Sequence, residues 1–254
     1  MIQIFFSISI LFASIQLHAK CFSHDLSVFP ESKEIDQNSI IMLIGYGYDQ
    51  PLIDSLCLGY TVFLVSVNDT VNLEVECINR GMFLLTQAIL KPQTPLIVGQ
   101  RYHLIIKNQK GQNMRAPSFY REELDGYENA SWMVIEHLDN EAPYFLSFPV
   151  LSESKTLHHG CGPEVYAQFE CSIQDDSEVL VKTEFKEFDN KETVVYYLIS
   201  RGRKQIYIGH GMCSGAFKYR PEKMYQVRFC LVDLNGNTNS TWTDWITFKS
   251  PFKT

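Results

Sequence analysis

Two short segments carry the residue types that hold metals or act as nucleophiles. They are His158-His-Gly-Cys161 and His210-Gly-Met-Cys213. Two histidines and two cysteines could bind zinc tetrahedrally, but neither segment has the Cys-x-x-Cys or His-x-x-x-His spacing of such a site. In an oxidising compartment the two cysteines would pair with each other, which would also leave no thiolate for catalysis. The segments therefore predict a disulfide bond, and we expect neither a metal site nor a cofactor.

The cysteine content predicts further disulfide bonds. The chain has seven cysteines, and Cys21 is left over once the others are paired within the two halves. The four cysteines of the second half allow three pairings, and sequence alone does not choose among them. We favour Cys161–Cys213, in glycine-flanked loops, and Cys171–Cys230, although Cys230 is out of phase with its buried neighbours. The candidates in full are Cys57, Cys77, Cys161, Cys213, Cys171 and Cys230.

Carboxylates are numerous but scattered, for example in Asp175-Asp-Ser-Glu178 and Glu122-Glu-Leu-Asp125. Glycoside hydrolysis needs two carboxylates across a cleft, which spacing along one chain does not establish. The first of these segments also lacks the alternating pattern of a calcium loop. No Gly-x-Ser-x-Gly elbow, phosphate-binding loop or His-Glu-x-x-His helix occurs. We therefore predict no catalytic residue and a protein that is not an enzyme; the alternative is a secreted hydrolase with its site at a domain junction.

Residues 1–19 predict export as a signal peptide. They form an apolar run ending in Leu17-His-Ala19, which loosely fits the small-residue pattern of a cleavage site, although no Lys or Arg precedes the run. The run is shorter than the ~20 residues that span a membrane. We expect no membrane span in the mature chain, and a location in the periplasm, at the cell surface or outside the cell.

Composition excludes two classes of partner. With a formal net charge of −7 and a pI near 5.5, the chain lacks the basic face of a nucleic-acid-binding protein. It also lacks a polybasic patch for anionic membranes. Asn68, Asn129 and Asn239 begin Asn-x-Ser/Thr triplets and are candidate glycosylation sites, provided that the host glycosylates exported proteins.

The elements that must position these residues are β-strands. Apolar and polar residues alternate over residues 225–232, and an Asn235-Gly236 turn leads to a second strand at residues 242–248. Residues 96–111 repeat this arrangement, with Tyr102 opening a strand as Tyr225 does. Outside the signal segment, no stretch shows the 3.6-residue apolar period of a helix, apart from the ambiguous residues 119–124. The pattern favours two successive β-sandwiches, each built around such a hairpin.

We place the boundary between the two sandwich domains after residue 139. The first domain is then 20–139 and the second 140–254, with Pro143 stiffening the junction. Besides the hairpin strands, we expect strands at residues 38–44, 60–67, 72–77, 82–90, 131–136, 144–149, 165–173, 179–188, 193–200 and 205–209, an irregular edge at 27–34 and a short helical turn at 119–124. Loops 45–51, 108–130 and 209–215 are where we expect partner contacts.

The second half resembles fibronectin type III and related immunoglobulin-like domains. The resemblance rests on Tyr225-x-Val-x-Phe, Asp233-x-Asn-Gly-Asn237, Trp245-Ile-Thr-Phe248 and the leading Asp139-x-x-Ala-Pro143. The first half is similar to bacterial immunoglobulin-like domains through residues 38–43 and Val98-Gly-x-x-Tyr-x-Leu104. These motifs imply an architecture and a binding or spacer role, and they transfer no catalytic residue.

Thr241-Trp-Thr-Asp-Trp245, together with Arg228, also resembles the Trp-Ser-x-Trp-Ser box of cytokine-receptor fibronectin domains. In that family the tryptophans stack with strand arginines through cation–π contacts. Thr243 and Ile246 stand where the family has serines, and the first half lacks the family's paired cysteines and Cys-x-Trp signature. The resemblance predicts Trp242, Arg228 and Trp245 stacked on one sheet.

Together these observations predict an exported binding or spacer protein of the cell envelope or extracellular space. Its partner would be another protein or a cell-surface component. A secreted, cytokine-receptor-like binding protein is the second alternative, beside the hydrolase.

Overall fold

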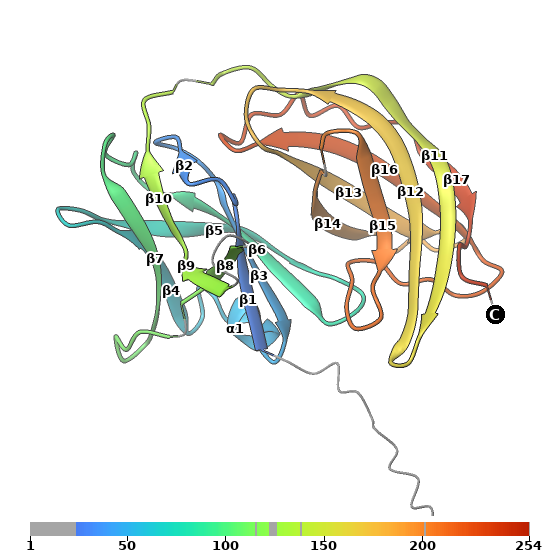
Figure 1. Ribbon diagram of the computed structural model, residues 1–254, viewed down its shortest axis with the longest axis horizontal. Helices are drawn as coiled ribbons and strands as arrows, with labels where there is room; N and C mark the ends of the chain where they lie inside the picture. The colour runs from blue at the N-terminus through green and yellow to red at the C-terminus, as the bar shows by residue number, and fades with distance from the viewer. Residues whose placement is uncertain (1–23, 115, 122–125, 138, 201, 254) are drawn as a thin grey trace, which may run out of the picture.

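The structure is a computed structural model that describes residues 24–114, 116–121, 126–137, 139–200 and 202–253. The described chain is almost entirely β-structure and forms two sandwiches that lie side by side (Figure 1). The predicted all-β, immunoglobulin-like fold is therefore confirmed. The predicted signal peptide and Cys21 lie outside the described residues, so export stays a prediction. No helix in the described ranges has the length and apolar character of a membrane span.

The first sandwich contains ten strands and one short helix. They are β1 (His24–Phe29), β2 (Glu34–Ile35), β3 (Ile41–Gly47), α1 (Gln50–Asp54), β4 (Tyr60–Val65), β5 (Thr70–Arg80), β6 (Leu85–Pro92), β7 (Arg101–Asn108), β8 (Ser118–Arg121), β9 (Gly126–Asn129) and β10 (Ser131–Val134). Eight strands form one sheet in the order β1-β3-β6-β5-β4-β7-β10-β2, and β8 pairs with β9. β5 pairs with β4 over residues 70–73 and with β6 over residues 73–80, so that it joins the two layers, and its pairing with β6 contains a register shift between Val75 and Cys77.

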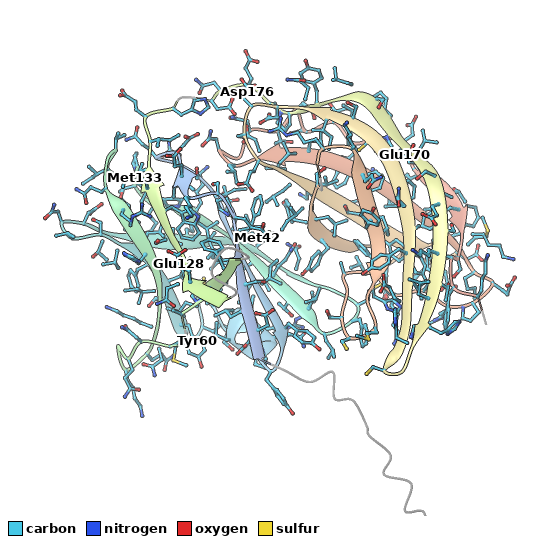
Figure 2. All side chains as sticks on the ribbon, in the orientation of Figure 1. Met42, Tyr60, Glu128, Met133, Glu170 and Asp176 are labelled. Carbon is cyan, nitrogen blue, oxygen red and sulfur yellow. The ribbon has the colours of Figure 1, made fainter. Side chains whose placement is uncertain are left out.

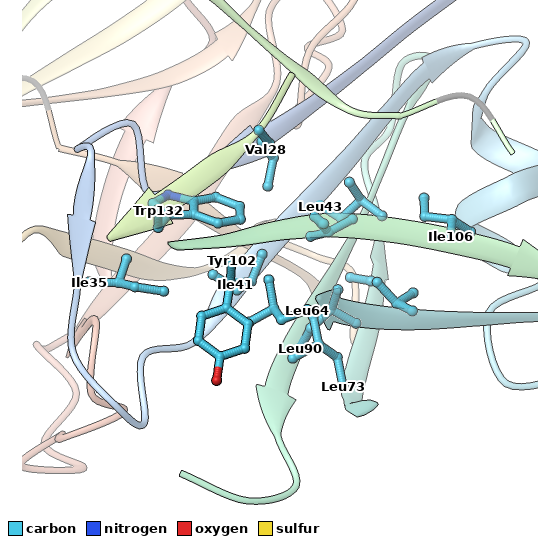
Figure 3. Packing of buried hydrophobic residues seen from close by; sticks show 14 of the residues in the cluster. Val28, Ile35, Ile41, Leu43, Leu64, Leu73, Leu90, Tyr102, Ile106 and Trp132 are labelled. Carbon is cyan, nitrogen blue, oxygen red and sulfur yellow. The ribbon is translucent and has the colours of Figure 1, made fainter. Parts of the chain in front are cut away.

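The core of the first sandwich lies between its two layers. Ile41 and Leu43 of β3 belong to this core, whereas Met42 between them faces the opposite way, as the period of a strand requires. Trp132 and Tyr102 are the largest fully buried side chains, and Figure 3 shows their rings among aliphatic neighbours. The alternation along each strand therefore produces both an inner core and a second apolar face.

The second sandwich has seven strands in two sheets. They are β11 (Tyr144–His159), β12 (Gly162–Gln174), β13 (Val179–Glu187), β14 (Val194–Ile199), β15 (Gln205–His210), β16 (Met224–Asp233) and β17 (Ile246–Lys249). The sheets have the orders β11-β12-β15 and β14-β13-β16-β17, which is the strand order of a fibronectin type III domain. Aromatic rings join the sheets, and Phe169 of β12 meets Phe229 of β16 at 5.4 Å between ring centroids.

Both sandwiches place a buried tyrosine at the start of a core strand. The backbone N–H of Ile97 donates to the hydroxyl of Tyr102 at 3.1 Å, and the N–H of Arg220 donates to that of Tyr225 at 2.7 Å. The spacing is five residues in each case. This is the tyrosine corner of immunoglobulin-like sandwiches, which ties a strand to the loop before it. The repeat seen in the sequence therefore corresponds to the same local structure.

A separate hydrophobic cluster lies between the two sandwiches. Met42 and Ile89 from the first pack with Leu180 and Leu234 from the second. Met42 lies near the centre of the molecule, where the sandwiches face each other (Figure 2). The outward face of β3 and β6 thus covers the outward face of β13.

Gln87 of β6 supplies the polar contact at this interface. Its side chain is fully buried. The amide Nε2 donates to the carbonyl of Tyr197 at 3.0 Å, and Oε1 accepts from the backbone N–H of Tyr197 at 2.6 Å. Tyr197 lies on β14, the edge strand of its sheet. The amide of Gln87 therefore satisfies the open backbone edge of β14 as a neighbouring strand would.

Loop 209–215, which we expected to face a partner, instead contacts the first sandwich. Phe83 and Gly215 exchange two backbone hydrogen bonds, at 3.2 and 2.9 Å. The ring of Phe83 also meets the ring of buried His210 edge-on at 5.5 Å. A Cβ on Gly215 would stand 2.2 Å from the Cβ of His210, so the close approach requires glycine.

Several predicted elements differ from the structure. The helical turn expected at 119–124 is wrong, because Ser118–Arg121 is strand β8 and Phe119 packs edge-on against Trp132 at 5.6 Å. Residues 122–125 lie outside the described ranges. Helix α1 begins within the expected loop 45–51, with Pro51 in its first turn and Ile53 buried beneath it. The expected edge strand at residues 144–149 runs on to His159 as β11, through several register shifts.

The predicted disulfide pairings are wrong. Cys57, Cys77, Cys171 and Cys230 carry free thiols, and Cys161 is not the disulfide partner of Cys213. Cys57 is exposed after α1, whereas Cys77 faces the second sandwich.

The alternation of side chains along the strands explains why Cys171 and Cys230 do not pair. Cys171 points into the core, where burial raises the pKa of its thiol to about 11. Cys230 lies on the outer face of β16, next to Thr238. The two sulfurs are therefore on opposite sides of a sheet, as the mismatch in alternation had indicated.

Replacing Gln87 by alanine should weaken the interface. The change leaves the backbone N–H and C=O of Tyr197 buried without partners, which should lower the free energy of unfolding by about 1–3 kcal/mol. Urea unfolding measures the loss. Gln93→Ala, at an exposed position of the same sandwich, is the matched control. Equal stabilities for the two variants would contradict the role assigned to Gln87.

Candidate functional site

The outer face of sheet β14-β13-β16-β17 carries an alternating stack of aromatic rings and cations. The guanidinium of Arg228 on β16 lies 4.7 Å from the ring centroid of Trp242 and 4.7 Å from that of Trp245. Both tryptophans belong to the segment just before β17. The stacking predicted from the Trp-x-x-Trp segment is therefore confirmed.

Two lysines of β13 extend this stack. Nζ of Lys186 lies 4.6 Å from the ring centroid of Trp245. Nζ of Lys182 lies 5.8 Å from that of Trp242 and 5.6 Å from that of Tyr197. Residues two apart on a strand share a face, which places both lysines beside the tryptophans. We call the series Lys186, Trp245, Arg228, Trp242, Lys182 and Tyr197 the cation–π ladder.

Two further contacts fix the geometry of the ladder. Glu184 is the register partner of Arg228, and one of its carboxylate oxygens accepts from Nε and Nη2 of Arg228, each at 2.6 Å. Thr243 holds the irregular Trp segment on β16: its N–H donates to the carbonyl of Phe229 at 2.9 Å, and its hydroxyl accepts from the N–H of Phe229 at 3.1 Å. Thr243 thus keeps a hydroxyl where the receptor box has its first serine.

The chemistry of the ladder is that of a brace. Each cation–π contact contributes about 0.5–1 kcal/mol at an exposed site and more where water is excluded. The three cations and one carboxylate are only partly exposed. Because cations cover the ring faces, the ladder fixes the segment before β17 and offers neither a nucleophile nor an acid–base pair.

A second feature lies at the end of the first sandwich next to the linker. The hydroxyl of Tyr102 donates to Asp69 at 2.6 Å, and the hydroxyl of Ser66 donates to Gln100 at 2.5 Å. These bonds join turn 66–69 to loop 96–100. The joined loops expose Val67, Ile97 and Val98, whose exposed fractions are 98%, 46% and 39%. We call these three residues the apolar loop patch.

Three carboxylates converge near the junction of the sandwiches. Oxygens of Asp139, Asp175 and Asp233 lie within 4.8 Å of one another, and they are the converging group of possible metal ligands in the described part of the chain. Asp233 is fully buried and accepts from the backbone N–H and the side-chain amide of Asn237, each at 2.7 Å. Asp175 accepts from the N–H and hydroxyl of Ser177, at 2.7 and 2.8 Å.

Asp175 and Asp233 accept hydrogen bonds that close turns, and Asp139 borders a shallow pocket beside them. A glycosidase pair flanks its substrate at about 5–9.5 Å, which this closer and largely buried group cannot do. Burial raises the pKa of Asp233 to about 6, and Asp139 and Asp175 add to the shift. The alternative of a hydrolase at the junction therefore gains no support from this cluster.

The remaining predicted sites stay apart. The two His-Cys segments do not form a converging ligand group in the described ranges. The ring of His210 is buried against Phe83, with Nδ1 at 2.8 Å from the carbonyl of Gly211, and burial lowers its pKa. Asn68, Asn129 and Asn239 are exposed, so all three can be reached, and their glycosylation stays a prediction.

Sequence reasoning missed the lysines of the ladder and the apolar loop patch. The alternation of Lys182, Glu184 and Lys186 was a signal for one shared face, but nothing local linked that face to the tryptophans. The patch gave no signal, because Val67 reads as the continuation of strand β4.

Comparison with known proteins gives structural neighbours only. Neither a protein family nor a curated protein matches the chain. A chain of a cytokine receptor complex is similar at 10% identity, over 90% of this chain and 98% of that one, with a TM-score of 0.27. The FN1–FN3 domains of chicken CNTN1 are similar at 10% identity, over 90% of this chain and 64% of that one, with a TM-score of 0.27. A segment of two fibronectin type III domains from chicken tenascin is similar at 11% identity, over 89% of this chain and 98% of that one, with a TM-score of 0.22. At such TM-scores these likenesses add nothing to what the strand order establishes.

Arg228→Lys should loosen the ladder. Lysine keeps the charge but not the planar group that stacks between two rings and binds Glu184 twice. We expect a loss of about 1–2 kcal/mol in the free energy of unfolding, with a change in tryptophan fluorescence. Arg220→Lys is the control, since the Arg220 side chain is 75% exposed. A ladder variant as stable as this control would show that the stack contributes nothing.

Asp233→Asn should remove part of the pH dependence of stability. The folded pKa of about 6 exceeds the unfolded value, so this group favours folding at low pH and its contribution is lost as the pH rises from about 4 to 6. Between pH 7 and pH 5 the wild type should gain about 1 kcal/mol more than the variant. Urea unfolding with EDTA present measures this, and Asp189→Asn, at an exposed position, is the control. Parallel pH profiles would refute the assignment.

Proposed function

We propose that this chain is an exported, non-enzymatic binding protein of the cell envelope or extracellular space, constructed like a cytokine-receptor ectodomain, with another protein as its partner. The observation that carries the proposal is Arg228 stacked between Trp242 and Trp245 in the second of two consecutive sandwiches. Sandwiches of this class are rigid scaffolds whose loops make the contacts.

The apolar loop patch is the partner surface that we favour. Val67 is almost completely exposed, yet the turn that carries it is held by the hydroxyls of Ser66 and Tyr102. Rigid loops lose little conformational entropy on binding, and exposed aliphatic groups gain from burial. A spacer has no need of such a patch, which favours a binding role over a purely structural one.

The absence of catalysis is part of the proposal. Its support is that the converging carboxylates are turn acceptors with Asp233 fully buried, and that the ring faces of the ladder are covered by cations. In both arrangements the polar groups are engaged in contacts that stabilise the structure.

Val67→Asp should weaken partner binding without unfolding the chain. The test is an array of secreted and cell-surface proteins from the same organism, probed with the mature chain. We expect at least one partner, whose affinity falls by about tenfold or more when a charge enters the patch. Leu58→Asp is the matched control, since Leu58 is 79% exposed at the opposite end of β4.

Two results would overturn the proposal. One is binding that Val67→Asp and Leu58→Asp weaken equally. The other is turnover by the purified chain in a panel of glycoside, ester and peptide substrates, with no protein bound on the array.

A further inference from the structure

Strand β11 is an open edge of the sheet β11-β12-β15 in the second sandwich. It runs along the side of this sandwich that is turned away from the first one (Figure 1). In the described part of the chain, only β12 forms backbone hydrogen bonds with it. An open edge presents unpaired N–H and C=O groups with which another strand can pair. The residues along β11 therefore decide whether this edge is closed to other chains or available to them.

The two parts of β11 differ in this respect. The part before Val150 has two register shifts and contains Pro149, which lacks an N–H, and both features close an edge to further pairing. The part from Val150 to His159 has no proline and a single shift, at Ser152. This second part is therefore the one that another strand can reach.

The C-terminal segment passes the second part of β11 without pairing with its backbone in the described ranges. Its contact is with the hydroxyl of Thr156, which donates to the carbonyl of Pro251 at 2.5 Å and accepts from the N–H of Lys253 at 3.2 Å. Thr156 is the register partner of Val165, a core residue, so its side chain points to the core side of the sheet. The contact thus leaves the main-chain groups of the edge available.

Four exposed side chains form an evenly spaced row on the outer face of this edge. They are paired with every second residue of β12, from Glu170 to Glu164, and they are Val150, Glu153, Lys155 and Leu157. The extra residue Ser152 keeps Val150 on the same face as the other three. Neither charged group has an ion-pair partner in the described ranges. We call these four residues the edge row, which reads aliphatic, acidic, basic, aliphatic.

The edge row is its own complement. A two-fold axis through Ser154, perpendicular to the sheet, places a second copy of β11 antiparallel to the first. Glu153 then lies opposite Lys155 of the second copy, and Val150 lies opposite its Leu157. Such cross-strand pairs stabilise a sheet, whereas like charges directly opposite each other destabilise it. An axis at Glu153 or at Lys155 would oppose like charges, so the charges select a single register.

We propose that two copies of this chain associate through β11, with the continuous sheet order β15-β12-β11-β11-β12-β15. A two-fold contact between identical surfaces is the commonest way in which identical chains associate. The paired segment, residues 150–157, has the ordinary length of a strand. A contact along one strand is smaller than the roughly 800 Å² per partner of a standard interface, so we expect a weak dimer with a Kd on the order of 100 μM.

The test is sedimentation velocity of the mature chain from about 5 to 500 μM. The salt concentration is about 150 mM, so that the net charge of −7 on each copy is screened. Glu153→Lys and Lys155→Glu should each weaken self-association by about tenfold or more, because two favourable pairs become two repulsive ones. An equimolar mixture of the two variants should associate about as strongly as the wild type, since every acid then faces a base.

Glu192→Lys is the matched control, because it makes the same change in charge in the exposed loop between β13 and β14. Thermal unfolding establishes that each variant is folded. The proposal fails if the wild type stays monomeric at the highest concentration, if the mixture does not associate, or if Glu192→Lys weakens association as much as Glu153→Lys.

A strand of another protein is the competing occupant of this edge. Binding of such a protein that Lys155→Glu weakens, without any self-association of the wild type, would assign the edge to that protein and refute the dimer. Val67→Asp, on the other sandwich, should leave the dimer unchanged. Failure of the dimer and failure of the proposed partner binding are therefore distinguishable.

Discussion

The arrangement of the whole molecule depends on one buried amide. Gln87 pairs with the backbone N–H and C=O of Tyr197 inside an apolar cluster. If the second sandwich were placed differently against the first, this pairing would break. Polar groups would then be buried without partners, at a cost of about 1–3 kcal/mol each. Tyr197 is also the last ring of the ladder, against Lys182. The interface and the braced outer face are therefore fixed by the same residue, and the linker need not hold them.

The parts of the fold that follow from local rules were predictable from the sequence. Alternation placed the strands, because one face of each strand is buried. Tyr102 and Tyr225 were recognisable as equivalents, since each bonds to a backbone N–H only five residues away. The stacking of Trp242 and Trp245 on Arg228 could be anticipated because the tryptophans share one short segment and the arginine lies on the preceding strand.

Contacts between distant segments were not predictable in the same way. Cys171 and Cys230 both lie within core strands of the second sandwich. Cys230 is out of phase with the buried residues of its strand, so its sulfur points to the outer face. The partner of Gln87 is 110 residues away, and no local pattern marks it. Helix α1 was missed because it has only five residues, too few to show a helical period. Strand register and contacts between distant segments decide such features, and neither leaves a local pattern in a single sequence.

The two outer faces of the second sandwich show how similar residues acquire different roles. On one face, Trp242 and Trp245 have cations against their rings, so the rings are already occupied and contribute rigidity. On the other face, the rings of Tyr166 and Tyr207 meet edge-on, with centroids 6.1 Å apart. Aromatic content alone does not separate the two faces. The contact that each ring makes does, because a ring stacked against cations braces the segment that carries it, whereas an edge-on pair joins two neighbouring strands.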